Sequence, residues 1–417
     1  MTSNWIFHPD TFDTGGREGR HRPEYDDRGW LKVEADRPWD TYANEFRAYD
    51  GIGWFRREVR LARKARLARL TFEGAGYHTR VWVNGRLVGE HAGPYTPFSF
   101  RVERLLRGGR NVIAVRVHNT YDATTIPIRR TDWLKYGGLT RPVSLTTADG
   151  PAFHHATALI SGPDHFPILT ARGTVEAPRS ARGALQVTAA IRARPGGPAL
   201  ARSAGVVRAG AFAIPIPAAR LPRWSPDRPR LVYLDLALTD SGGRILDRRT
   251  VRTGVRTIRW DAGRLRINGE SVWLRGVNMV EEYPDWTCSP TRAQARARIL
   301  DIKRNLHGNF FRAAHYPHHP RFLEACDELG LLVLDEIPMC YLPAGHDRAG
   351  KGGAHATAAV TAAAAGGTDT LARASALAQA MQWRDAHHPA VILWSAATSG
   401  RRNSRRRPGK SSRCSGP

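Results

Sequence analysis

The stretch Asp-Glu-Leu-Gly-Leu-Leu-Val-Leu-Asp-Glu-Ile-Pro, residues 327–338, decides the fold of the second half of this chain. Its Gly330 is typical of a helix end, and Pro320 is typical of the start of that helix. The apolar run after Gly330 is short enough to be a buried strand. A helix followed at once by such a strand indicates parallel strands joined by crossover helices.

The same alternation of strand and helix is predicted to begin at Ile258. We expect strands at 273–279, 308–314, 331–337 and 390–395. Ser289 and Pro290 predict the start of a further helix between the first two strands. The apolar stripe of that helix is predicted to be Ala295, Ile299, Ile302 and Leu306.

Residues 1–148 have the pattern of an all-β region. Apolar and polar positions alternate over 79–90 on either side of Asn84-Gly85, a dipeptide that accepts positive φ in a two-residue hairpin. Residues 111–118 are apolar on both faces, which predicts a central strand. From 149 to 256, short apolar runs lie between Pro-rich and Gly-rich turns, which predicts a second β domain.

Three motifs occur in a specific order, namely Leu-Arg-Gly-Val-Asn at 274–278, Phe-Arg-Ala-Ala-His-Tyr-Pro at 311–317 and the stretch 327–338. With residues 384–395, they resemble glycoside hydrolase family 2, the family of β-galactosidases and β-glucuronidases. The resemblance implies a multidomain β plus α/β fold. Its parts would be a jelly-roll sugar-binding domain at 1–148, an immunoglobulin-like β-sandwich at 149–256 and the N-terminal half of a TIM-barrel catalytic domain at 257–395.

The resemblance also implies the chemistry of a retaining β-glycosidase, which uses two carboxyl groups ~5 Å apart as acid/base and nucleophile. In the family, Trp-Ser on the fourth barrel strand is followed within a few residues by Gly-Asn-Glu, whose Glu is the acid/base. Here the acid/base Glu expected near Ala397–Ser399 is absent, and the strand that would carry the nucleophile lies beyond the sequence. No catalytic residue is therefore identifiable, and we expect an inactive chain. Glu336 is the one carboxylate to nominate as a substitute proton donor.

Six positions match the family's substrate-binding residues. By resemblance they lie at or near the ends of successive barrel strands: Asn278, Arg312, His315, Asp335, Glu336 and Trp394. Arg312 would orient the acid/base or nucleophile carboxylate by charge-assisted hydrogen bonds, and His315 would bind a sugar hydroxyl or a transition-state charge. The alternative for both residues is structural hydrogen bonds at the barrel mouth. The alternative for Asp335 and Glu336 is a structural role, as acceptors of backbone N–H groups or partners of Arg312.

The loop at 279–285 departs from the family, which commonly has basic or His residues there, so no sugar preference can be carried over. Glu282 and Asp285 in this loop could contact sugar hydroxyls, although exposed acids are more often only solvated. The pairs His318–His319 and His387–His388 are predicted to be capping or surface residues rather than metal ligands. No metal site and no cofactor are expected, although the family sometimes uses Mg²⁺ or Na⁺.

Two segments are predicted to be disordered. Residues 343–369 have low complexity and few side chains that could anchor a core, which favours a disordered insertion over an active-site lid. Residues 396–417 form a basic tail with seven Lys or Arg and no acidic residue. A real basic tail of this kind would bind nucleic acid or an acidic surface.

The competing interpretation of the tail is a shifted reading frame. If the coding sequence after Ala396 were GGC AAC GAG CGG C, loss of a single G would give GCA ACG AGC GGC, which encodes residues 397–400. The chain would then end within half a barrel, with an open strand edge and an exposed apolar interior, both of which promote aggregation.

Composition sets the remaining bounds. The chain has 417 residues and a formal charge of +25, but most arginines are scattered singly through strand and helix patterns, so we expect solvated surfaces and no nucleic-acid partner. The four cysteines have neither metal-ligand spacing nor the density of a disulfide scaffold. Without an apolar leader or a long apolar run, we expect a cytoplasmic protein that binds no membrane.

The expected function is therefore that of a family 2 β-glycosidase, which hydrolyses β-galactosides, β-glucuronides or related sugars. We expect this chain to be inactive because both catalytic Glu residues are missing. The alternative is a non-catalytic carbohydrate-binding protein. The expected partner is a carbohydrate substrate, and a homo-oligomer is an open option. A binding protein would show saturable affinity for sugar without turnover, whereas a frameshift remnant would be poorly soluble and bind nothing well.

Overall fold

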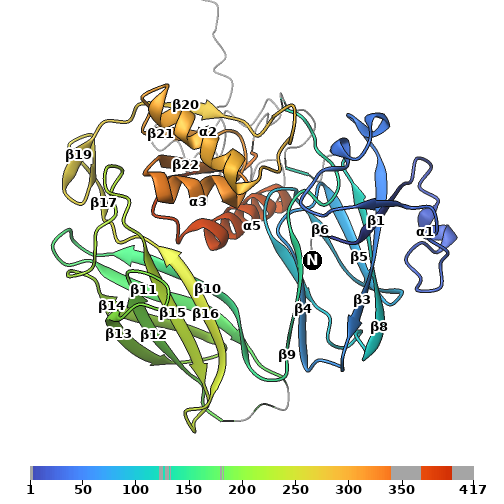
Figure 1. Cartoon of the computed structure of the whole chain (residues 1–417), viewed down its shortest axis with the longest axis horizontal. Coiled ribbons are helices and arrows are strands. Elements are labelled where there is room, and N and C mark those ends of the chain that lie inside the picture. The colour runs from blue at the N-terminus through green and yellow to red at the C-terminus, as the bar shows by residue number, and fades with distance from the viewer. Residues whose placement is uncertain are drawn as a thin grey trace, which may run out of the picture.

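The computed structural model describes residues 3–121, 125–126, 131, 133–178, 181, 183–339 and 368–396. The predictions for residues 397–417, and for 343–369 apart from the first two residues of helix α5, lie outside this part of the chain. Figure 1 shows three bodies: a blue to cyan β region, a green to yellow β region, and an orange to red region of parallel strands and helices that lies against both.

The first body is a sandwich of two antiparallel sheets. The larger has the order β2 (Leu31–Val33), β1 (Trp5–Pro9), β3 (Ile52–Leu61), β8 (Gly109–His118), β5 (His78–Val83), β6 (Arg86–Ala92). The smaller has the order β7 (Phe98–Arg101), β4 (Leu67–Phe72), β9 (Val143–Ala148). Three short helical turns lie outside the sheets: α1 (Gly15–Glu18), η1 (Trp39–Thr41) and η2 (Asn44–Phe46).

The predicted hairpin is confirmed, since β5 pairs with β6 across Asn84 and Gly85, whose φ angles are 49° and 80°. The predicted central strand β8 pairs with β3 on one side and β5 on the other. Its side chains are therefore buried on both faces, and the core between the sheets includes Trp5, Trp39 and Phe55.

The second body is also a two-sheet antiparallel sandwich. One sheet has the order β10 (Ala152–Ser161), β11 (Ile168–Glu176), β14 (Ala211–Pro217). The other has the order β13 (Ala199–Val206), β12 (Gln186–Arg192), β15 (Val232–Thr239), β16 (Ile245–Thr253). Along β15, Val232, Leu234, Leu236 and Leu238 are buried and alternate with half-buried residues, as expected for a strand with one face on a core.

A small antiparallel sheet, β17 (Ile258–Asp261), β18 (Arg264–Ile267) and β19 (Glu270–Val272), connects the second and third bodies. The prediction that strand and helix alternate from Ile258 is wrong for these residues. Short runs separated by Ala262-Gly263 and Asn268-Gly269, all at positive φ, form tight hairpins and leave no room for a crossover helix.

The described part of the third body has four parallel strands in chain order, β20 (Gly276–Met279), β21 (Phe310–Ala313), β22 (Leu332–Glu336) and β23 (Val391–Ser395). Its described helices are α2 (Arg292–Arg304), α3 (Pro320–Leu329) and α5 (Thr368–Asp385). None of the described helices is long and apolar enough to cross a membrane.

Helix α2 begins later than Ser289 and Pro290 predicted. Thr291 is the N-cap, because its side chain accepts from the Gln294 N–H while the Gln294 side chain accepts from the Thr291 N–H. Ala295, Ile299 and Ile302 are buried as predicted. The fourth member of the stripe, Leu306, is 55% exposed because the helix ends at Arg304.

Helix α3 has the predicted ends, with Pro320 in its first turn and Gly330 after its last residue. Gly330 has a φ of 71°, a left-handed conformation that disfavours any residue with a Cβ. It also lies against the Pro226 carbonyl of the second body, with which a Cβ would overlap. The glycine therefore both ends α3 and allows the third body to pack on the second.

We predict that Gly330→Ala destabilises the protein by about 2 kcal/mol or more, since it adds left-handed strain to an overlap with rigid backbone. Urea unfolding followed by tryptophan fluorescence measures the change. Gly16→Ala is the matched control, because no atom lies within 4 Å of a Cβ placed there. Equal midpoints for the two variants would contradict this account of Gly330.

Candidate functional site

The carboxyl ends of the parallel strands hold an ion pair between Arg312, on β21, and Glu336, the last residue of β22. Arg312 donates from Nη2 to Glu336 Oε1 at 2.7 Å and from Nε to Oε2 at 3.1 Å. The Glu336 side chain is only 2% exposed, and that of Arg312 is 23% exposed. Two parallel hydrogen bonds fix the planes of the guanidinium and the carboxylate relative to each other, so the guanidinium presents its remaining edge to the open end of the strands.

His315 completes this cluster two residues after β21 ends. Its Nδ1 lies 3.4 Å from Arg312 Nη2 and 3.7 Å from Glu336 Oε1. The imidazole ring also stacks on Trp133 of the first body, with centroids 5.1 Å apart and an angle of 21° between the rings. His315 is therefore held by two domains at once.

Trp133 is itself fixed by two tyrosines. Its Nε1 donates to the Tyr95 hydroxyl at 3.1 Å, and the Tyr95 ring stacks on Tyr316 at 4.0 Å. Sequence reasoning missed Trp133, because it lies in a connection with no strand or helix pattern. The one signal was a tryptophan among turn-forming residues, where no local core explains so large an apolar side chain.

The strand register decides which of the predicted substrate-binding residues meet. Paired residues of neighbouring parallel strands point to the same face, and faces alternate along each strand. Asn278 pairs with Arg312, so the exposed Asn278 shares the face of the Arg312–Glu336 pair. Asn278, Arg312, His315 and Glu336 thus lie together at the strand ends.

The structure does not bring Asp335 and Trp394 to this cluster. Asp335 pairs with Trp394 in the parallel register. Because Asp335 is next to Glu336 in the strand, its side chain and that of Trp394 point to the opposite, helix-covered face. Asp335 is fully buried near Arg384 and Asp385 of α5, and burial, reinforced by the charge of Asp385, raises its pKa well above the ordinary value. Trp394 lines a separate cavity of about 880 Å³ with Trp383 and strands of the second body.

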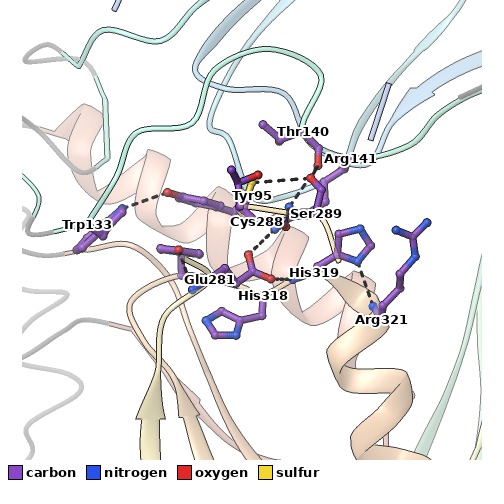
Figure 2. Close-up of polar contacts among 12 residues, drawn as sticks. Tyr95, Trp133, Thr140, Arg141, Glu281, Cys288, Ser289, His318, His319 and Arg321 are labelled. Carbon is purple, nitrogen blue, oxygen red and sulfur yellow. Dashed lines mark hydrogen bonds and ion pairs between the residues drawn. The ribbon is translucent and has the colours of Figure 1, made fainter. Parts of the chain in front are cut away.

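A buried polar network joins the first and third bodies beside the cluster (Figure 2). At its centre, Arg141 donates from Nη2 to Glu281 Oε2 at 2.7 Å, and their side chains are 1% and 0% exposed. Arg141 also donates to the Cys288 carbonyl at 2.8 Å, and the His319 N–H donates to Glu281 Oε1. Burial alone would raise the pKa of Glu281, but Arg141 and the nearby histidines hold it below the ordinary value.

The network extends to Asp36 of the first body, which accepts from His319 Nε2 at 3.0 Å and pairs with Arg321 at 2.7 Å. Burial lowers the pKa of His319 to about 4. The prediction that the His318–His319 pair caps a helix or lies at the surface is half right. His319 caps α3, but both histidines are buried.

The loop after β20 also forms one wall of a cavity of about 940 Å³, and the first body forms the other wall. Glu282 and Asp285 both line this cavity, and Glu282 accepts a hydrogen bond from the Leu134 N–H across it. Asp40 lies on the opposite wall, where burial raises its pKa to about 6. In the described residues, no group of three or more His, Cys, Asp or Glu gathers as a metal site would require.

Comparison with known proteins identifies the family. Residues 21–149 match the model for the sugar binding domain of glycosyl hydrolases family 2, and residues 258–406 match the model for its TIM barrel domain. The first match lies within the first body, and the second match covers the third body together with the small sheet before it. The chain belongs to glycoside hydrolase family 2.

Among curated relatives, a putative β-glucuronidase of Formosa agariphila is 30% identical over 75% of this chain and 38% of its own length. A β-galactosidase of Thermoanaerobacter pseudethanolicus is 27% identical over 80% of this chain and 46% of its own length. A solved β-glucuronidase from Bacteroides uniformis superposes with a TM-score of 0.77 at 25% identity, over 94% of this chain and 46% of that one. The chain therefore spans less than half the length of these relatives.

We predict that Glu281→Gln destabilises the protein by about 3–5 kcal/mol, because it leaves the Arg141 charge buried without a counter-charge. Chemical unfolding at neutral pH measures the loss. Glu328→Gln is the matched control, since Glu328 is 37% exposed and pairs with Arg252 at the surface. If both variants lowered the free energy of unfolding by a similar small amount, Glu281 would not be the counter-charge that stabilises buried Arg141.

A pH-dependent prediction follows from Asp40. Between its ordinary pKa of 3.8 and its folded value of about 6, the folded carboxyl binds a proton that the unfolded one has lost, so stability falls as pH rises through this window. We expect Asp40→Asn to be more stable than the parent at pH 8 by about 2–3 kcal/mol, and this gain to shrink below pH 6. Thermal unfolding from pH 4 to 8 measures the difference in stability. Asp285→Asn is the control, because it removes another carboxylate from the same cavity. A gain that is independent of pH would refute it.

Proposed function

We propose that the cluster of Asn278, Arg312, His315 and Glu336 binds the terminal sugar of a β-glucuronide, a β-galactoside or a related β-glycoside. The observation that carries the proposal is the bidentate Arg312–Glu336 pair beside His315, at the carboxyl ends of strands that match a family 2 barrel. In barrel enzymes these strand ends carry the substrate. The relatives named as β-glucuronidase and β-galactosidase support the two sugar classes.

Each member of the cluster has a defined role in this proposal. Glu336 occupies Nε and Nη2 of Arg312, which leaves Nη1 to donate to a substrate oxygen. His315 and Asn278 offer ring and amide groups to the sugar hydroxyls on the same side. Because Trp133 covers one face of His315, a sugar can contact the imidazole by its edge or its other face.

We further propose that this chain does not hydrolyse the bound sugar. Retention needs an acid/base and a nucleophile ~5 Å apart, and Ala-Thr-Ser-Gly occupies 397–400 where the family has Gly-Asn-Glu. In the part of the chain that the structure describes, no carboxylate other than Glu336 pairs with Arg312 or His315. Both Glu336 oxygens accept hydrogen bonds from Arg312, which holds the carboxyl group against the guanidinium. Sugar binding without turnover is also the behaviour of the alternative, a carbohydrate-binding protein.

The domain division that fits this proposal is a jelly-roll domain at 1–148, an immunoglobulin-like sandwich at 149–256 and half of a barrel at 257–395. Two features support it. The second body has seven strands in sheets of three and four, as immunoglobulin-like sandwiches do. The third has four parallel strands in sequential order, as successive strands of a barrel do.

The proposal predicts saturable binding of methyl β-D-glucuronide or methyl β-D-galactoside to the purified chain, measured by isothermal titration calorimetry. Arg312→Ala should weaken that binding at least tenfold, because it removes a charged donor and leaves Glu336 unpaired. Arg244→Ala is the control, since Arg244 lies at an exposed turn of the second body. Unchanged affinity in Arg312→Ala, or no binding of either sugar, would refute the proposed site.

The same preparation tests the absence of hydrolysis. We expect no release of p-nitrophenol from the corresponding p-nitrophenyl glycosides. We also expect no covalent labelling by cyclophellitol-6-carboxylate aziridine, which the solved Bacteroides uniformis β-glucuronidase 2 binds covalently. Turnover that disappears in Glu336→Gln would instead assign the proton transfer to Glu336.

A further inference from the structure

A second cavity lies between the second and third bodies, separate from the Arg312 cluster. The outer face of the sheet β10–β11–β14 and the turn before β14 form one wall, and α5 with β23 forms the other. Its volume of about 880 Å³ lies within the range of ~300–1,000 Å³ for small-molecule sites, which often occur at domain interfaces. The cluster residues are outside its lining, so the sugar proposed for the cluster does not account for this cavity.

Two tryptophans give the cavity aromatic area. Trp383 of α5 is 48% exposed and Trp394 of β23 is 38% exposed, so both rings offer open surface to a ligand. The second body holds Trp383 in place, because His155 Nε2 donates to the Trp383 carbonyl at 2.8 Å and the two rings lie 4.3 Å apart. Aromatic surface inside a concave space favours a ligand with an aromatic ring system.

The charged side chains of the lining are both positive. Arg172 lies on β11, and Arg208 lies in the turn between β13 and β14. The described lining contains no Asp or Glu, and no hydrogen bond or ion pair joins either guanidinium to another described residue. Burial lowers the pKa of His155, which keeps this residue of the lining neutral at pH 7. Because a guanidinium binds a carboxylate through two parallel hydrogen bonds, the lining favours an anion.

A buried hydroxyl group on the same face of the sheet is also available. Thr157 on β10 is only 8% exposed, and its Oγ1 makes no hydrogen bond with any described residue. Thr157 pairs with Arg172 in the antiparallel register, so the two side chains are neighbours on the face that lines the cavity. A buried hydroxyl without a partner costs free energy that a ligand oxygen would restore. Thr157 and Arg172 are therefore adjacent donors for one carboxylate.

We propose that this cavity binds an aromatic carboxylate. The carboxylate accepts hydrogen bonds from Arg172 and Thr157, and the rings contact Trp383 and Trp394. Arg208 adds a second positive charge, which disfavours cationic ligands. This site goes beyond the function proposed for the Arg312 cluster and does not depend on it.

The test measures dissociation constants of matched probes for the full chain, by calorimetry at neutral pH. The probes are 2-naphthoate, its neutral analogue 2-naphthalenemethanol, and acetate, which has the charge without the rings. We expect 2-naphthoate to bind at least tenfold more tightly than 2-naphthalenemethanol, because only the carboxylate pairs with Arg172. Acetate should not bind measurably. Equal affinities for the two naphthalene probes, or no binding of 2-naphthoate, would overturn the site.

Arg172→Gln removes the charge from an exposed strand position and keeps a polar side chain. This variant should bind 2-naphthoate at least tenfold more weakly, while its affinity for 2-naphthalenemethanol and its unfolding midpoint stay those of the parent. Arg86→Gln is the matched control, because Arg86 is an exposed residue of β6 in the first body. If Arg172→Gln kept the parent affinity, or if both variants lost it equally, the guanidinium contact would be refuted.

Trp394→Leu tests the contact with the rings. We expect it to weaken both naphthalene probes by about fivefold, because the aromatic surface that they share a contact with is lost. Trp260→Leu is the control, since Trp260 is 58% exposed on β17 and lies outside the lining. Parent affinity in Trp394→Leu would overturn the ring contact.

Competition separates this site from the proposed sugar site. Saturating methyl β-D-glucuronide should leave the affinity for 2-naphthoate unchanged, because the Arg312 cluster and the cavity share no residue. Displacement of 2-naphthoate by the glucuronide would place both ligands in the cluster and overturn this proposal. If the glucuronide does not bind, the Arg312 site fails, and the binding of 2-naphthoate to the parent and to Arg172→Gln still decides the cavity.

Discussion

Arg141 and Glu281 form an ion pair that is closed off from solvent and joins two domains. Arg141 lies just before β9 of the first sandwich, and Glu281 follows β20 of the parallel sheet. Both side chains are almost fully buried, so each is the counter-charge that the other needs in the docked arrangement. The pair therefore fixes the position at which Trp133 meets His315, and also the width of the cavity between Glu282 and the first sandwich.

The alternation of side chains along parallel strands is the second constraint. It assigns Arg312 and Glu336 to the open face and Asp335 to the helix face, although Asp335 and Glu336 are neighbours in sequence. The two carboxyl groups consequently have opposite environments. Glu336 is paired with a guanidinium, whereas burial and the charge of Asp385 raise the pKa of Asp335 well above its ordinary value. Asp335 is thus a structural group of the interface with α5, whereas Glu336 lies on the open face and orients the more exposed Arg312.

Local patterns predicted much of this fold because their signals are local. The hairpin at Asn84-Gly85 and both ends of α3 follow from residues that favour a particular backbone conformation. The start of α2 was missed because Ser289 and Thr291 are both residue types that cap helices. Only the reciprocal hydrogen bonds of Thr291 and Gln294 show that Thr291 is the N-cap. The motifs predicted Arg312 and His315 as site residues, and they offered Glu336 as a partner of Arg312, a pairing that the structure contains. Trp133, Arg141 and Asp40 could not be predicted, because their roles depend on contacts with residues far away in the chain.

These long-range contacts mean that the parallel strands do not form the proposed sugar site alone. His315 would lose its ring partner without the first sandwich, and Glu281 would be buried without Arg141 or exposed by local rearrangement. The Arg312–Glu336 pair, by contrast, lies wholly within the parallel sheet and needs no other domain. The first sandwich therefore acts on the site in two separable ways: it restricts the approach to His315, and it supplies one wall of the neighbouring cavity. Trp133 is common to both contributions, because it stacks on His315 and also lines the cavity.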